Sequence, residues 1–247
     1  MVGLGRPIDP ADRAERALRA VRRALIADPD HLVVTGDLTE DGHKDQFAML
    51  ADVLEEAGVD PEATTLVAGN HDAYTEVDAF EQALRGPLQD FARTSTPGTA
   101  VLRGKTAIVA LSTTMYQPIL RAAGTLRQTD VEALRRWIGA RSAEVTWLLT
   151  MHHGPWCEHP LLGPWVDGLI GQDALEELLH AHSNVCVLHG HSHQSITLRL
   201  RPNHAQVLCA PAVVDADDPL RLYRVGDHVV PVDSERWTDG PLVPAAA

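Results

Sequence analysis

The sequence His31-Leu-Val-Val-Thr-Gly-Asp37 joins an apolar run, of the kind that forms a buried strand, to a glycine and a carboxylate. The same order recurs three more times: an apolar run, then a motif rich in histidine, asparagine or aspartate. The other runs are 65–68, 145–151 and 185–189, and the motifs that follow them are Gly69-Asn70-His71-Asp72, His152-His153 and Gly190-His191-Ser192-His193. Ligands bind beyond the carboxyl ends of strands in open α/β sheets, so we expect the four motifs to meet at one such edge.

Helical periodicity alternates with these runs, which is typical of strand–helix–strand units in a parallel sheet. The expected helices are 11–27 with Asp9 as its N-cap, 43–57 ended by Gly58, 76–93 with a break near Gly86-Pro87, 129–140 with Thr129 as its cap, and 173–182. Strands are also expected over 100–102 and 106–111, around Gly104. Residues 112–127 and 154–171 show no periodicity, so we expect loops there, the second one roofing the site.

The pattern changes beyond Gln194, where apolar and polar residues alternate. The alternation predicts antiparallel strands or hairpins over 196–200, 207–208, 222–225 and 229–232. No linker divides the chain, so we expect a single domain, 1–247, with a core over about 10–235 and a loose tail over 237–247. The predicted fold class is α/β, a layered α/β/β/α sandwich with mixed sheets.

Composition narrows the function classes. The net charge of −13 disfavours a broad nucleic-acid footprint, but bound cations would still admit a small phosphorylated substrate. The three cysteines show no Cys-x-x-Cys spacing, which favours a reducing cytoplasm over a disulfide framework. No signal peptide is visible, and no apolar run approaches the ~18 residues of a membrane span. We expect a cytoplasmic protein without a membrane partner, and the oligomeric state stays open, a homo-oligomer included.

The residue types in the motifs suit a pair of metal ions. The five candidate ligands are Asp37, Asn70, His152, His191 and His193. An aspartate can bridge two cations, an asparagine supplies a carbonyl oxygen, and imidazoles suit zinc, iron or manganese. Two close cations would clamp a phosphate ester, and a metal-bound hydroxide would act as the nucleophile. His71 would lie near the metals without binding them, where it can protonate the departing alkoxide.

The ordered motifs resemble those of the calcineurin-like metallophosphoesterases. The stretches that carry the resemblance are Gly36-Asp-Leu-Thr-Glu-Asp-Gly42, Gly69-Asn70-His71-Asp72, Met151-His152-His153-Gly154-Pro155 and Gly190-His191-Ser192-His193. They stand in the family's order over roughly residues 10–215, each after a predicted strand. The likeness is greatest to the branch that hydrolyses cyclic nucleotides and glycerophosphodiesters. It implies a metal-dependent phosphoesterase fold that hydrolyses phosphodiesters at a dinuclear site.

The resemblance also implies how the metal ligands divide between two sites. Asp37 would bridge the two ions. Asn70, His152 and His191 would complete one site, and His193 would belong to the other. The implied cofactors are two divalent or trivalent ions, with manganese, iron and zinc all open.

Two further residues are implied to be catalytic. His71 would be the proton donor or a contact to the substrate phosphate, and Asp72 would orient its loop. Of the two adjacent histidines, His152 is the implied ligand, and His153 is expected either to support the ligands without binding the metal or to be structural. The implied partner is a small phosphorylated substrate, either a phosphodiester or a cyclic nucleotide.

One family motif is missing from the sequence. The family opens with a strand ending in Asp-x-His, and no Asp-x-His precedes Asp37 here. We therefore expect the sheet to lack its first strand and one metal site to be poorly bound, with only one ion held. Two explanations stay open, a translation start assigned too far downstream and a real loss. The alternative function is a non-catalytic or weakly active protein of this fold that acts as a binding or scaffold module.

Overall fold

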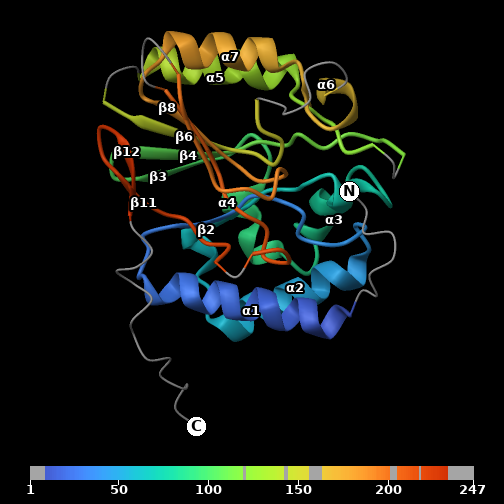
Figure 1. Ribbon diagram of the computed structural model, residues 1–247. Helices are drawn as coiled ribbons and strands as arrows, with labels where there is room; N and C mark the ends of the chain where they lie inside the picture. The colour runs from blue at the N-terminus through green and yellow to red at the C-terminus, as the bar shows by residue number, and fades with distance from the viewer. Residues whose placement is uncertain are drawn as a thin grey trace.

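The protein is described here by a computed structural model that covers residues 9–118, 121–141, 144–155, 163–200, 205–216 and 218–232. Its principal helices are α1 (Pro10–Ile26), α2 (Lys44–Ala57), α5 (Gln128–Ala140) and α7 (Gln172–Ala181). Figure 1 shows α5 and α7 above the larger sheet and α1 and α2 at the bottom. The smaller sheet lies between α1 and α2 on one side and the larger sheet on the other. The predicted α/β/β/α sandwich is confirmed.

The larger sheet has six strands and is mixed. Its strands are β3 (Ala100–Arg103), β4 (Thr106–Ala110), β6 (Thr146–Thr150), β8 (Val185–His189), β9 (Ile196–Arg199) and β10 (Gln206–Cys209). They lie in the order β3-β4-β6-β8-β10-β9, and the four inner strands run parallel. The two edge strands, β3 and β9, are antiparallel to their neighbours.

Alternation along the inner strands builds two separate core layers. Trp147, Leu149 and Met151 of β6 and its end pack under α5 and α7, whereas Leu148 faces the smaller sheet. Strands β4, β8 and β10 divide their side chains in the same way, because successive strand residues point to opposite faces. The sheet is thus covered on both faces, as expected for parallel strands.

The smaller sheet pairs β1 (Leu32–Val34) in parallel with β2 (Thr64–Leu66). Phe47 and Leu54 of α2 pack against it together with the short helices that follow β2. The remaining α-helices and strands are α3 (Ala79–Ala83), α4 (Ala92–Ser95), α6 (Gly163–Val166), β5 (Gly124–Thr125), β7 (Leu169–Ile170), β11 (Leu222–Val225) and β12 (Val229–Val232), and the described residues also form three short 3-10 helices, Pro61–Ala63, His71–Ala73 and Gln89–Phe91. β11 and β12 form the predicted hairpin.

Local capping chemistry explains where the first helices begin and end. The carboxylate of Asp9 accepts hydrogen bonds from the N–H groups of Ala11 and Asp12, which confirms it as the N-cap of α1. Gly58 ends α2 in the left-handed conformation, with φ of 76°, as predicted. The predicted cap Thr129 is wrong, since α5 already begins at Gln128.

Three other expectations need correction. β10 is parallel to β8 rather than part of a wholly antiparallel end, because it lies between β8 and β9. The expected loops 112–127 and 154–171 contain β5 and β7, which pair with each other, and α6. The predicted helix over 76–93 is broken as expected, but only α3, α4 and a 3-10 turn between them are helical. The predicted loose tail over 237–247 lies outside the described residues.

No helix in the described ranges combines the length and the apolar character needed to cross a membrane.

His31, directly before β1, makes folding sensitive to acid. Its Nε2 lies 2.8 Å from the hydroxyl of Thr65, and burial, followed by the charge of Arg103, lowers the pKa of His31 to about 4. The folded state resists protonation of His31, whereas the unfolded chain is protonated there near pH 6.5. The contribution of neutral His31 to the unfolding free energy is therefore fully present above about pH 6.5 and is lost as the pH falls toward 4.

We expect His31→Gln to flatten that part of the stability curve. Between pH 6.5 and 4, the unfolding free energy of the variant should fall by about 1–2 kcal/mol less than that of wild type, a value discounted for the partly exposed ring. Urea unfolding at several pH values measures it, with the exposed His228→Gln as control. A variant curve that keeps the wild-type slope between pH 6.5 and 4 would contradict this assignment.

Candidate metal centre

Three of the five predicted ligands lie next to a fourth, His152. The Nε2 atom of His152 lies 3.3 Å from Oδ2 of Asp37, 3.2 Å from Oδ1 of Asn70 and 3.3 Å from Nδ1 of His191. Each residue follows a different strand, β1, β2, β6 or β8. The prediction that these motifs meet beyond the strand ends is therefore confirmed for these four side chains.

Hydrogen bonds on the far side of each group fix which atom faces the centre. Nδ1–H of His152 donates to the carbonyl oxygen of Thr35 at 2.8 Å, which leaves the Nε2 lone pair for the centre. The side-chain N–H of Asn70 donates to the hydroxyl of Tyr74 at 2.8 Å, which turns Oδ1 inward. Sequence reasoning missed Tyr74. Its spacing of four residues from Asn70 was the signal, since such pairs meet on one side of a helical turn.

The donor set fits a metal ion. A carboxylate oxygen, an amide oxygen and a second imidazole nitrogen each lie 3.2–3.3 Å from Nε2 of His152. This mixture of oxygen and nitrogen ligands suits manganese, iron or zinc. The centre is also mostly buried, since Asn70 and His152 are each only 2% exposed.

Electrostatics keeps the carboxylate ionised. Burial alone raises the pKa of Asp37, but the adjacent His152 and then His71 outweigh it and hold that pKa below its usual range. For His152 the effects have opposite signs: burial lowers its pKa, but the charge of Asp37 outweighs burial and raises the pKa above its usual value. The carboxylate is therefore ready to bind a cation.

His71 lies beside this centre and is held at two points. Its backbone N–H donates to Oδ1 of Asp37 at 3.1 Å, and its Nδ1–H donates to the carbonyl oxygen of Glu40 at 2.7 Å. The ring stacks obliquely on Tyr74, with 4.9 Å between the centroids. With Nδ1 engaged, Nε2 is the ring nitrogen that remains to make a further hydrogen bond.

Asp72 organises the loops rather than facing the centre. Its carboxylate accepts from the backbone N–H groups of Leu38, Thr39 and Gly69, and from the Thr39 hydroxyl, at 2.7–3.0 Å. Burial, then the charge of Asp37, raises the pKa of Asp72 to about 6, although these hydrogen bonds oppose the rise. The predicted role in orienting the loop agrees with these contacts.

His153 is close to the centre but has both nitrogens engaged. Together with His152 and His191 it forms a group compact enough to hold an ion. However, Nε2–H of His153 donates to the carbonyl oxygen of Ala122 at 3.0 Å, and Nδ1 accepts from the hydroxyl of Thr113 at 2.8 Å. These bonds leave no lone pair for a metal, so the contacts support the structural role predicted for His153.

His193 stands apart from the other predicted ligands in the hydrogen bonds of the described residues. Its Nδ1 lies 2.5 Å from Oδ2 of Asp215, and both side chains are 44% exposed. The structure thus assembles one ligand group around His152, while a second site at Asp37 and His193 stays a prediction.

The comparisons decide the family. Residues 9–195, about three quarters of the chain, match the family model described as calcineurin-like phosphoesterase. The chain belongs to this family. A relative from Synechococcus sp., described as a probable cyclic nucleotide phosphodiesterase, is 33% identical over 171 residues. That match covers 68% of this chain but only 59% of the relative.

Solved structures share the fold of this calcineurin-like phosphoesterase at low identity. The protein TT1561 of Thermus thermophilus is 15% identical, with a TM-score of 0.51 over 80% of this chain and 85% of that one. A putative 5'-nucleotidase from Staphylococcus aureus is 13% identical, with a TM-score of 0.50 over 78% of this chain and 43% of that one.

Backbone strain in this family member gathers at the candidate ligands. Among the described non-glycine residues, positive φ occurs at Asp37 (51°), His191 (67°) and His193 (55°), and otherwise only at Asp28. Such conformations cost on the order of 1–3 kcal/mol each and persist where the surroundings hold them. Their concentration in two motifs is an independent sign of a functional site.

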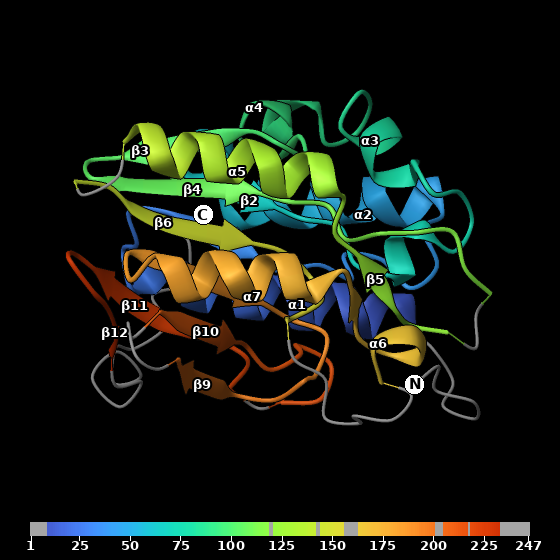
Figure 2. The ribbon, with the colours of Figure 1, turned by 90° about the horizontal axis from the view of Figure 1, so that it is seen from above.

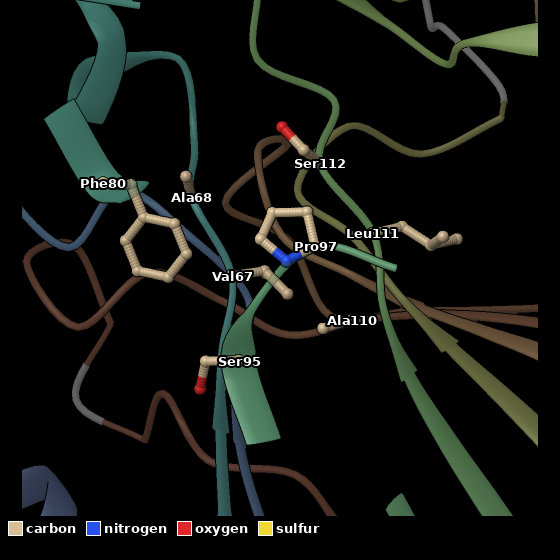
Figure 3. A pocket seen from close by; sticks show the side chains of 8 residues that line it. All are labelled: Val67, Ala68, Phe80, Ser95, Pro97, Ala110, Leu111 and Ser112. Atoms are coloured by element: carbon tan, nitrogen blue, oxygen red, sulfur yellow. The ribbon is translucent and has the colours of Figure 1, made fainter. Parts of the chain in front are cut away.

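A narrow cleft is lined by residues that follow β2 and by the end of β4 and the residues after it. It lies between Val67 and Ala68 on one side and Ala110 to Ser112 on the other, with Pro97 between them, and has essentially no room for a water molecule (Figure 3). Ligand pockets usually measure roughly 300–1,000 Å³. The cleft is therefore a gap in the packing of the two sheets, and the ligands at the strand ends remain the candidate site.

Close backbone approach predicts one sensitive glycine. A Cβ on Gly69 would lie 2.1 Å from Oδ1 of Asp37 and 2.4 Å from its backbone nitrogen, which no rotamer can relieve. We expect Gly69→Ala to displace the carboxylate and to weaken Mn²⁺ binding about tenfold or more.

Isothermal titration with Mn²⁺ measures the effect, and Gly139→Ala is the matched control. Gly139 lies in α5 with open space at its Cβ position, so alanine there should leave metal binding unchanged and stabilise the helix by up to about 1 kcal/mol. Equal Mn²⁺ affinity in both variants would refute the steric argument.

Proposed function

We propose that this chain is a metal-dependent phosphoesterase that hydrolyses a small phosphodiester. The observation that carries the proposal is the contact of Asp37, Asn70 and His191 with Nε2 of His152. Membership of the calcineurin-like phosphoesterase family supports it. The relative described as a probable cyclic nucleotide phosphodiesterase favours a cyclic nucleotide as the diester.

The chain's own residues would divide the work. Bound cations would stabilise negative charge on the phosphate oxygens and lower the pKa of an attacking water. Asn70 and the two imidazoles hold their donor atoms in fixed positions, so little reorganisation accompanies the reaction. His71, held beside Asp37 by its own backbone N–H, would place Nε2 against the leaving alkoxide and protonate it.

We propose a dinuclear site in which Asp37 bridges and His193 binds the second ion. The carboxylate has one oxygen at His152 and the other at the His71 N–H, so a second ion would have to approach the His71 side. His193 would supply Nε2 as its ligand atom, because its Nδ1 is hydrogen-bonded to the carboxylate of Asp215. With few ligands there, the second ion should bind more weakly than the first.

The test is Mn²⁺-dependent hydrolysis of bis-p-nitrophenyl phosphate and of a cyclic nucleotide. We expect turnover that EDTA abolishes and Mn²⁺ restores. His71→Gln should lower the turnover number about 10²–10⁴-fold, the usual contribution of a general acid. Mn²⁺ affinity should change little, since His71 contacts Asp37 through its backbone N–H, which the substitution keeps, while its Nδ1 bonds to the Glu40 carbonyl.

The exposed His228→Gln serves as control and should retain full activity. Absence of turnover from the unaltered chain with Mn²⁺, Fe²⁺ and Zn²⁺ would exclude the enzymatic proposal. Tight metal binding without turnover would instead support the alternative, a binding or scaffold protein of this family.

A further inference from the structure

The histidine after Gly190 has an acidic neighbour that no motif predicts. Nε2 of His191 lies 3.0 Å from the carboxylate Oδ1 of Asp167 and 3.1 Å from the backbone carbonyl oxygen of the same residue. His191 is largely buried, whereas the side chain of Asp167 is half-exposed, so the carboxylate reaches the ring from the solvent side.

Asp167 is held by a small, well-bonded element at the end of the molecule. It lies between α6 and β7, and Figure 2 shows β5 and α6 at the end toward which β4 and β6 point. Ala122 N–H donates to the Val166 carbonyl at 2.9 Å, and Gly124 N–H donates to the Gly168 carbonyl at 2.8 Å, one residue on either side of Asp167.

Side chains reinforce the same element. Leu169 is fully buried in the core beneath α5 and α7. On the outside, the guanidinium of Arg121 lies 4.6 Å from the ring centre of Trp165 and donates to its carbonyl oxygen at 2.5 Å. The position of Asp167 is thus fixed from both sides, which a positioning group requires.

The contact determines which nitrogen of His191 carries the proton. Nε2–H is donated to two oxygens of Asp167, so the neutral ring keeps its lone pair on Nδ1. Nδ1 is the atom that faces Nε2 of His152 at 3.3 Å. The carboxylate also makes the imidazole a stronger donor, as in the carboxylate–histidine–metal arrangements of other metal sites.

We propose that Asp167 is a positioning residue for the metal centre, which fixes the tautomer of His191 and raises its affinity for the ion. This inference rests on the proposed metal site and not on the reaction. The carboxylate contributes to both effects: it accepts the Nε2–H of His191 beside the backbone carbonyl, which fixes the tautomer, and its charge strengthens the ligand.

Two readouts separate this role from a merely structural one. The first is the Mn²⁺ affinity from isothermal titration, which should fall about 10–100-fold in Asp167→Ala and less in Asp167→Asn, which keeps an acceptor. The second is the long-range ¹⁵N–¹H NMR spectrum of the metal-free protein, which reports the tautomer of each histidine. Wild type should show Nε2-protonated His191, and Asp167→Ala should show a mixture.

The matched control is Asp45→Asn. Asp45 also faces a histidine, His43, but at 3.7 Å on the exposed start of α2, so the variant should bind Mn²⁺ like wild type. If Asp167→Ala and Asp167→Asn both retain the wild-type affinity and His191 tautomer, the proposal is overturned. Failure of the unaltered chain to bind Mn²⁺ would also overturn it. Binding without hydrolysis would refute only the proposed reaction.

Discussion

The buried carboxylate of Asp72 ties together the two loops on which the site depends. It accepts four hydrogen bonds from the segment after Asp37 and from Gly69, so the ends of β1 and β2 are held in one arrangement. Hydrogen bonds to a charged acceptor are stronger than neutral ones, and removing a buried acceptor would leave four donors unsatisfied. The strained Asp37 can therefore keep its left-handed backbone beside Asn70 and His71.

Sequence patterns predicted the layers and the convergence of the ligands, because both follow from strand period and from the direction of parallel strands. They could not show that β10, and not β9, pairs with β8, since apolar and polar residues alternate in the same way in an edge strand and in its neighbour. β5 and β7 are two residues each and carry no period. Tyr74 stood at a readable spacing of four residues from Asn70, but Asp167 did not, because its contact depends on a loop that folds back to His191 from 24 residues earlier in the chain.

The structure surrounds the candidate ligands with a second layer that decides the state of each one. Thr35, Tyr74 and Asp167 engage the far side of His152, Asn70 and His191, respectively. In this arrangement the donor atoms are oriented before an ion arrives, and less conformational entropy is lost on binding. Asp215 stands in the same relation to His193, on a more exposed side of the Gly190–His193 motif. The family fold thus supplies rigid strands that carry the candidate ligands, while loops from distant parts of the chain determine the hydrogen bonding of each ligand.

The central claim is that one ion binds where the four loops meet. The direct test is a crystal structure of the full chain grown with Zn²⁺, with anomalous data collected on both sides of the zinc absorption edge. The account predicts a peak about 2.0–2.2 Å from Oδ of Asp37, Oδ1 of Asn70, Nε2 of His152 and Nδ1 of His191. An empty centre, with zinc found only on exposed histidines, would contradict it.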